Sequence, residues 1–151
     1  MPLHVIRPAR AQDSAELARL ASQLGYPVSD DAMRLRLQRL LASSREIVFV
    51  AEHPGGGLAG WIHGVLSQFV ESDYRVEIGG LVVDERFQRM GVGRALVKRI
   101  EAWAFEQGVT QTVVRCRTTR VESHKFYESL GYIQSKTQIV FRKTLSPPPD
   151  K

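Results

Sequence analysis

The chain is poor in cysteine, because Cys116 is the only one among its 151 residues. One cysteine cannot close an internal disulfide, and it cannot build a metal cluster of several thiolates. The four histidines are also scattered without the spacing of metal ligands: they are His4, His53, His63 and His124. We therefore expect neither a disulfide-stabilised secreted domain nor a catalytic metal.

Long apolar runs are absent as well. No stretch approaches the roughly 20 apolar residues that cross a bilayer. Residues 1–10 lack the charged start, apolar stretch and small-residue cleavage site of a secretory signal. The expected location is the cytoplasm, with no membrane partner.

The chain has no polybasic block, although Lys and Arg total 21 against 16 Asp and Glu, giving a net charge of +5. Such a surplus favours anionic partners such as phosphates, acidic ligands or nucleic acid. The basic residues are scattered, and no recognition-helix motif accompanies them. We expect a phosphate-bearing ligand and no nucleic acid.

The content of hydrophobic residues, 43%, is enough for a core of the chain's own. We expect one domain over residues 1–145 and a flexible proline-rich tail over residues 146–151. Patterning predicts helices at residues 13–24, 29–41, 91–107 and 122–130. It predicts strands at residues 4–7, 47–51, 58–66, 74–84, 112–117 and 139–143.

Local signals support several of these boundaries. Asp13 offers a carboxylate cap to the first helix, with Glu16 three residues later as in a capping box. Ser29 is a good start for the second helix, and Gly108 is placed to end the third. Strands 74–84 and 112–117, joined by a helix, form a right-handed parallel crossover. The expected fold class is mixed α/β: a largely antiparallel sheet with a central parallel β-α-β unit, flanked by helices.

The most informative segment runs from the end of one strand into a helix, Val82 to Leu96. Gly91 and Gly93 at the helix start let backbone approach a ligand, and free N–H groups there favour phosphate. A nucleotide P-loop is excluded because Gly-Lys-Ser/Thr is missing, and a dinucleotide fingerprint would need a small residue at Leu96. Glycines that only shape a turn remain the alternative. The basic residues of the segment are Arg86, Arg89 and Arg94.

Two motifs together point to a family. Gln88-x-x-Gly91-x-Gly93 after an apolar strand resembles the coenzyme A signature of the GNAT superfamily of N-acetyltransferases. About thirty residues later, Ser123-His124-Lys125-Phe126-Tyr127 followed by Gly131-Tyr132 resembles its second signature. The order of elements from His4 to Lys143 and the opening Ile6-Arg7-Pro8-Ala9 are also similar to the family.

The resemblance implies acetyl-CoA as cosubstrate. Backbone N–H groups around Gly91 would hold its pyrophosphate, and its pantetheine arm would lie along Leu81–Val83, with the Leu81 N–H polarising the thioester carbonyl. Arg120 stands where many members have an asparagine that touches pantetheine, and Arg120 and Lys125 could reach the phosphates instead. The implied coenzyme-binding residues are Leu81, Val82, Val83, Gln88, Arg89, Met90, Gly91, Val92, Gly93, Arg94, Arg120, Ser123 and Phe126.

Acetyl transfer needs a neutral amine, so a base must remove a proton from the ammonium form. The resemblance makes Glu77, four residues before Leu81, the first candidate, acting directly or through water; His63, Glu71 and Asp73 are weaker alternatives. The same resemblance makes Tyr127 the acid that protonates the departing thiolate.

Cys116 could carry the acetyl group in a ping-pong mechanism, but a lone cysteine in an apolar strand is more often inert, so direct transfer is expected. In this family acceptor choice resides in regions that correspond here to Gly25–Ser44 and Ser67–Arg75. Asp30, Asp31, Glu71 and Asp73 in these segments could attract a cationic amine. We expect a small-molecule primary amine. A protein N-terminus or lysine, or a coenzyme A sensor without catalysis, is the alternative, and a homodimer is possible.

Overall fold

The structure, a computed structural model, describes residues 4–150. The chain forms two compact units, the first ending at Arg115 and the second beginning at Cys116. The expected division into residues 1–145 and 146–151 stays a prediction, and residues 1–3 and 151 lie outside the described part. Within that part, no helix is both long and apolar enough to span a bilayer.

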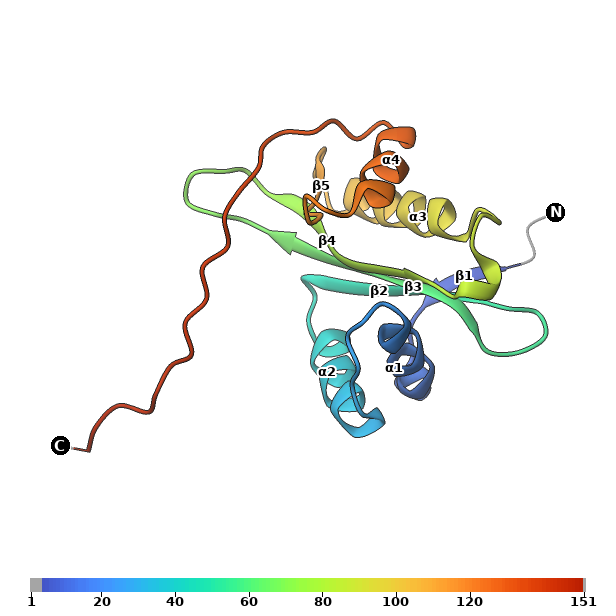
Figure 1. Cartoon of the computed structure of the whole chain (residues 1–151), viewed down its shortest axis with the longest axis horizontal. Coiled ribbons are helices and arrows are strands. Elements are labelled where there is room, and N and C mark those ends of the chain that lie inside the picture. Colours follow the sequence, from blue (N-terminus) through green and yellow to red (C-terminus); the bar gives the residue numbers. More distant parts are fainter. Residues whose placement is uncertain (1–3, 151) are drawn as a thin grey trace. The chain divides into compact units, whose positions relative to one another are not determined.

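The first unit is built on a five-stranded sheet in the order β1-β2-β3-β4-β5 (Figure 1). Its strands are β1 (Val5–Pro8), β2 (Glu46–Glu52), β3 (Leu58–Ser67), β4 (Arg75–Val83) and β5 (Thr112–Val114). The first four pair antiparallel with their neighbours, and β5 pairs parallel with β4. The predicted mixed sheet with one parallel β-α-β unit is confirmed.

Helices cover both faces of this sheet. Figure 1 shows α1 (Ser14–Gln23) and α2 (Asp30–Ala42) on one face and α3 (Val92–Glu106) on the other. Short 3₁₀ helices, η1 (Ala11–Asp13) and η2 (Glu85–Phe87), precede α1 and α3. The core beneath α1 and α2 includes Leu17, Leu20, Leu37, Val48, Val50 and Val82.

The predicted apolar face of α3 is confirmed, because Val92, Leu96, Ile100 and Trp103 are all buried. Two glycines of β3 let this helix lie close to the sheet. A Cβ at Gly64 would lie 2.7 Å from Cδ1 of Ile100. A Cβ at Gly60 would lie 2.6 Å from the carbonyl oxygen of Val82, which is closer than carbon and oxygen can pack. Gly60 therefore requires glycine, because backbone blocks a Cβ there, whereas a Cβ at Gly64 would displace the end of the Ile100 side chain.

The capping box expected at α1 is wrong. Asp13 makes no cap bond to α1; its carboxylate instead accepts from the Arg10 N–H at 2.7 Å and from the Arg7 guanidinium at 2.8 and 3.0 Å. The Asp13 carboxylate therefore caps the short 3₁₀ helix η1 that precedes α1, and not α1 itself. The cap of α2 is confirmed, since Ser29 Oγ accepts from the Ala32 N–H at 3.1 Å.

Two strand predictions need correction. The strand expected at residues 112–117 ends at Val114, so Cys116 lies outside it. In the second unit, α4 (Val121–Ser129) forms as expected, but the strand predicted at residues 139–143 does not. Ile139, Val140 and Phe141 are 79 to 90% exposed. A strand forms only when its backbone pairs with another, and this segment pairs with no strand among the described residues.

Candidate coenzyme and acetyl-transfer site

Strand β4 has an open edge along half its length. It pairs with β5 only from Val76 to Ile78, whereas it pairs with β3 as far as Val83. The residues after Ile78 therefore have a strand on one side only among the described residues. An open edge offers unpaired backbone N–H and C=O groups to an extended ligand. Leu81, Val82 and Val83, the residues predicted to meet pantetheine, lie on this edge.

A β-bulge sits where the open edge begins. The register between β3 and β4 shifts after His63, so Gly79 has no opposite residue. As a result Glu77 opposes Val65 while Gly80 opposes His63. Directly opposed residues point to the same face of a sheet, and Val65 lies two residues from His63 on β3, so Glu77 and His63 share one face. The bulge adds Gly80 to that face, which simple alternation along β4 from Glu77 does not reveal.

The predicted coenzyme loop joins β4 to α3. Arg89 and Gly91 have positive φ angles, 63° and 83°, which turn the backbone sharply before the helix. The first helical backbone bond runs from the Ala95 N–H to the Gly91 carbonyl at 3.0 Å. The N–H groups of Val92 to Arg94 therefore have no acceptor within the helix. This arrangement suits an anion such as pyrophosphate.

The remaining loop residues add charge and exposure. Gln88, Arg89, Met90 and Arg94 are exposed, while Val92 is buried in the α3 core. The side chains of Arg89 and Arg94 can add to the backbone donors when a phosphate approaches. Because the side chain of Val92 is buried, only its backbone can take the predicted role in binding the coenzyme.

Asp84 anchors this loop, and the sequence analysis missed it. Its side chain is fully buried. It accepts from Arg19 Nη1 and Arg86 Nη2, both at 3.0 Å, and from the Arg86 N–H at 3.0 Å. Burial raises the pKa of the Asp84 carboxyl, but these hydrogen bonds outweigh it and hold the pKa well below its usual range. Through its hydrogen bond with Arg19, the Asp84 carboxylate connects the coenzyme loop to α1.

Glu77, the candidate base, is paired with a basic residue. Its side chain is about one quarter exposed and forms an ion pair with Arg115, which follows β5 by one residue. The parallel pairing of Glu77 with Val113 brings the two side chains together. The weaker candidates Glu71 and Asp73 lie instead in the exposed loop between β3 and β4.

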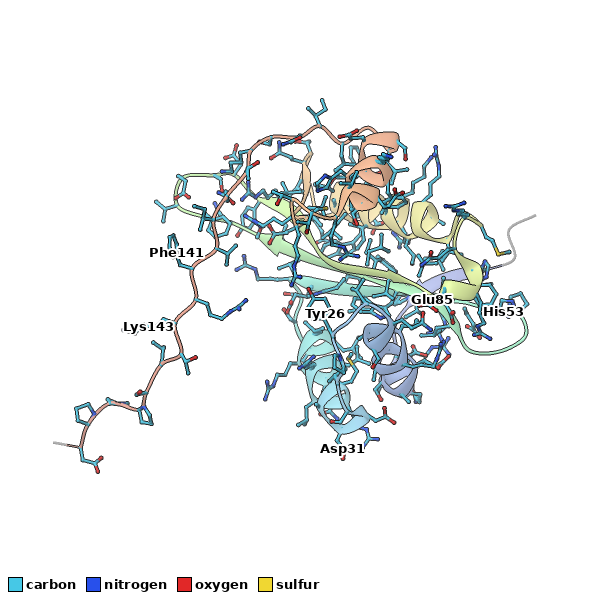
Figure 2. The ribbon with its side chains drawn as sticks, viewed as in Figure 1. Tyr26, Asp31, His53, Glu85, Phe141 and Lys143 are labelled. Atoms are coloured by element: carbon cyan, nitrogen blue, oxygen red, sulfur yellow. The ribbon has the colours of Figure 1, made fainter. Side chains whose placement is uncertain are left out.

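The β2–β3 loop of the first unit packs at the coenzyme end of the sheet. Figure 2 labels His53, from the β2–β3 loop, close to Glu85 of η2. The His53 ring stacks on Phe87 with centroids 4.5 Å apart. This packing fixes the β2–β3 loop against the segment that leads into the coenzyme loop.

The second signature lies in the second unit. Arg120 directly precedes α4, and Ser123, Phe126 and Tyr127 lie within it. The rings of Phe126 and Tyr127 are 5.0 Å apart. Burial raises the pKa of the Tyr127 phenol, with Cys116 adding to the effect, so the hydroxyl stays protonated at neutral pH. That these residues join Leu81 in one site stays a prediction.

Burial also raises the pKa of the Cys116 thiol, although Arg120 opposes the shift. A thiol is a poor nucleophile compared with a thiolate. This favours the predicted direct transfer over a ping-pong route through Cys116.

Comparison with known proteins identifies the family. The model of the acetyltransferase (GNAT) family matches residues 14–132. The chain is 29% identical over 146 residues to aminoglycoside N(6')-acetyltransferase type 1 of Stenotrophomonas maltophilia, covering 94% of each.

Solved structures share the fold. The aminoglycoside antibiotic 6'-N-acetyltransferase of Acinetobacter baumannii superposes with a TM-score of 0.84 at 17% identity, over 95% of this chain and 99% of that one. An aminoglycoside N-acetyltransferase in complex with CoA gives 0.84 at 22% identity, over 93% and 94%. The chain therefore belongs to the acetyltransferase (GNAT) family and is an acyltransferase enzyme.

Proposed function

We propose that this enzyme moves an acetyl group from acetyl-CoA directly to a primary amine of a small molecule, with aminoglycosides as the first candidates to test. The observation that carries the coenzyme part is the open edge of β4, which leads through Asp84 into a helix start with free N–H groups. The relative from Stenotrophomonas maltophilia, matched along nearly its whole length, suggests the acceptor class.

The residues fit the coenzyme in two places. Leu81 to Val83 offer backbone partners to an extended arm, and the turn at Arg89 and Gly91 exposes donors for phosphate. A Cβ at Gly91 would meet nothing within 4 Å, so a ligand has room at this point. The coenzyme supplies an acetyl thioester, whose carbonyl the Leu81 N–H would polarise.

Two side chains carry the predicted proton transfers. Glu77 accepts a proton from the acceptor nitrogen, directly or through water, and its ion pair with Arg115 holds the carboxylate in place. Tyr127 donates a proton to the departing thiol, and burial supports this role because it keeps the phenol protonated. By the resemblance to the family, Arg120, Ser123 and Phe126 of the second signature would also contact the coenzyme.

Exposed acidic residues favour a cationic acceptor. Asp30 and Asp31 begin α2, and Figure 2 labels Asp31 on that helix, while Glu71 and Asp73 lie in the β3–β4 loop. Aminoglycosides carry several ammonium groups and would be attracted to these carboxylates. A protein N-terminus or lysine is the second candidate, because it also presents a cationic amine.

We further propose that the enzyme works in the cytoplasm and pairs into a homodimer. The exposed apolar side chains near the end of the chain support pairing, since a second copy would remove them from water. They include Phe141, which is labelled in Figure 2 together with Lys143. Light scattering on the purified protein tests this, and a monomer at micromolar concentration would refute it.

A thiol-release assay tests the proposed activity. Purified enzyme is given acetyl-CoA and a panel of aminoglycosides, polyamines, amino acids and peptides with free N-termini. We expect turnover with at least one small amine and loss of turnover in Glu77→Gln, with Glu52→Gln on β2 as the matched control. Turnover with peptides alone would assign a protein acceptor, and coenzyme binding without any turnover would refute the proposal.

A further inference from the structure

We propose that His63, oriented by Glu46, takes the first of two protons that leave the acceptor nitrogen, and that Glu77 takes the second. This inference rests on the proposed function and deepens it. It assigns a catalytic residue on β3 and a positioning residue on β2, both outside the two sequence signatures.

The chemistry requires two proton acceptors. A primary amine near neutral pH is an ammonium ion, and it must lose one proton before its lone pair can attack. After attack the nitrogen is positively charged again and must lose a second proton. Imidazole is the side chain best suited to the first step, because it is the strongest base that is commonly neutral at this pH.

His63 is held in a defined orientation. Its Nε2 lies 3.1 Å from Oε1 of Glu46, and both side chains are about one quarter exposed or less. A carboxylate accepts a hydrogen bond, so this contact favours the tautomer that carries its proton on Nε2. Nδ1 is then left with a free lone pair.

That nitrogen lies over the bulge of β4. A Cβ built at Gly79 would lie only 2.9 Å from His63 Nδ1. Gly80, the residue directly opposite His63, also lacks a side chain, and a Cβ there would meet the Trp61 ring at 3.1 Å. Neither glycine needs a positive φ angle. A side chain at Gly79 would therefore have to displace the His63 ring, and one at Gly80 would crowd Trp61.

The glycines leave nothing but backbone between the imidazole and the open edge of β4. Neighbouring strands are about 4.8 Å apart, so a ligand paired to that edge lies one strand spacing beyond Gly79. One amine or one water molecule can span that distance. Trp61, whose buried Nε1 has no partner in the described residues, forms the adjacent wall and could donate to the acceptor.

Glu77 lies on the same face of the sheet, on the other side of the bulge. Its carboxylate pairs with Arg115, and any carboxylate is a far weaker base than an amine, so it draws a proton from an ammonium ion poorly. It is adequate for the more acidic nitrogen that forms after attack. The two groups therefore divide the work according to the acidity of the proton that each accepts.

The complete step balances. His63 Nδ1 accepts a proton from the ammonium, and the freed lone pair forms a C–N bond to the acetyl carbon. Glu77 accepts the second nitrogen proton, the C–S bond breaks, and the sulfur receives a proton from Tyr127. The products are the amide and coenzyme A. Water takes the protons from His63 and Glu77 and returns one to Tyr127, leaving a net release of one proton.

The test compares His63→Gln and Glu46→Gln with the matched control Glu52→Gln, which lies on the same strand as Glu46. Transfer to an amine is followed from pH 6 to 10, and CoA binding is measured by calorimetry. We expect His63→Gln to lower kcat by about 100-fold or more at neutral pH, with CoA affinity unchanged. The loss of kcat relative to the wild type should become smaller as the pH approaches the pKa of the amine, because more of the amine is then already neutral in solution. Glu46→Gln should show a smaller loss of the same form.

A third variant separates chemistry from structure. In His63→Ala, added imidazole should restore part of the activity. A loss that is equal at every pH and resists imidazole would make the ring structural and overturn the inference. If the wild type acetylates an amine and His63→Gln is equally active, the proton path is overturned but the proposed function stands. A wild type that binds CoA but acetylates no amine would overturn the proposed function, and the proton path with it.

Discussion

Nη1 of Arg19 lies 3.0 Å from Oδ2 of Asp84, and this contact joins the middle of α1 to the first residue after β4. Asp84 is fully buried, whereas Arg19 is partly exposed and also binds Glu16 at 2.6 Å. The Glu16 carboxylate in turn accepts from the Leu58 N–H at the start of β3. One charged network therefore connects α1, β3 and the coenzyme loop.

Asp84→Asn should weaken this network without changing its shape. The amide keeps one acceptor oxygen and replaces the other with an NH2 group that cannot accept from a guanidinium, so at least one hydrogen bond to a charged group is lost, worth about 1.5–3 kcal/mol. We expect the free energy of unfolding in urea to fall by about 2–3 kcal/mol and the KM for acetyl-CoA to rise, because η2 and the loop lose their anchor. Asp31→Asn, at an exposed ion pair with Arg34, is the control. Unchanged stability and KM would contradict this role.

Acid should unfold the protein through the same carboxylates. The pKa of Asp84 is lowered on folding, and so are those of Asp13 and Glu16. A lowered pKa means that the native state favours the charged form, so the stabilisation is present above the unfolded pKa of about 4 and is lost as pH falls below it. We expect stability measured by urea titration to decline from about pH 5 downward. Asp84→Asn should decline less steeply, and parallel curves would contradict the assignment.

Much of the fold could be predicted from the sequence because periodic patterns record burial directly. The apolar stripe of α3, from Val92 to Trp103, and the cap at Ser29 follow from local signals and were confirmed. The glycine-rich loop after β4 was likewise visible, since Gly91 occupies a backbone conformation that other residues resist.

The remainder depends on pairing between distant segments. The bulge at Gly79, which puts Gly80 and not Gly79 opposite His63, is a property of the register between β3 and β4. Asp84 and Glu46 become important only through partners about 65 and 17 residues away. The strand expected at residues 139–143 failed for the same reason, because a suitable pattern does not supply a neighbouring strand.

Gly60→Ala should destabilise the sheet beneath α3. The added methyl carbon would lie 2.6 Å from the Val82 carbonyl oxygen and 3.2 Å from Cδ1 of Leu96. Backbone cannot rotate away as a side chain can, so we expect a loss of about 1–3 kcal/mol in unfolding free energy. Gly55→Ala in the exposed β2–β3 loop is the control, since its new carbon would meet only the His53 ring. A melting temperature equal to that of the wild type would contradict this prediction, because β3 and β4 would then accommodate the methyl group without loss of stability.

Tyr127→Phe should remove the acid while keeping the ring. Phenylalanine preserves the contacts with Phe126 and Tyr132, whose rings lie 5.0 and 5.4 Å away. We expect kcat to fall by about 100-fold at pH 7 with little change in the KM for acetyl-CoA, because a departing thiolate would have to take its proton from water. Tyr132→Phe removes a hydroxyl from the same aromatic cluster and serves as the control.

The pH dependence of the wild type gives a second check on Tyr127. Burial raises the pKa of this phenol above the ordinary value of about 10, so its acid form persists through pH 9. The kcat of the wild type should therefore show no loss between pH 7 and 9 from ionisation of this group. If kcat instead fell tenfold across that range and Tyr127→Phe showed no such fall, the phenol would be ionising at ordinary pH. It could then not be the buried proton donor that the structure describes.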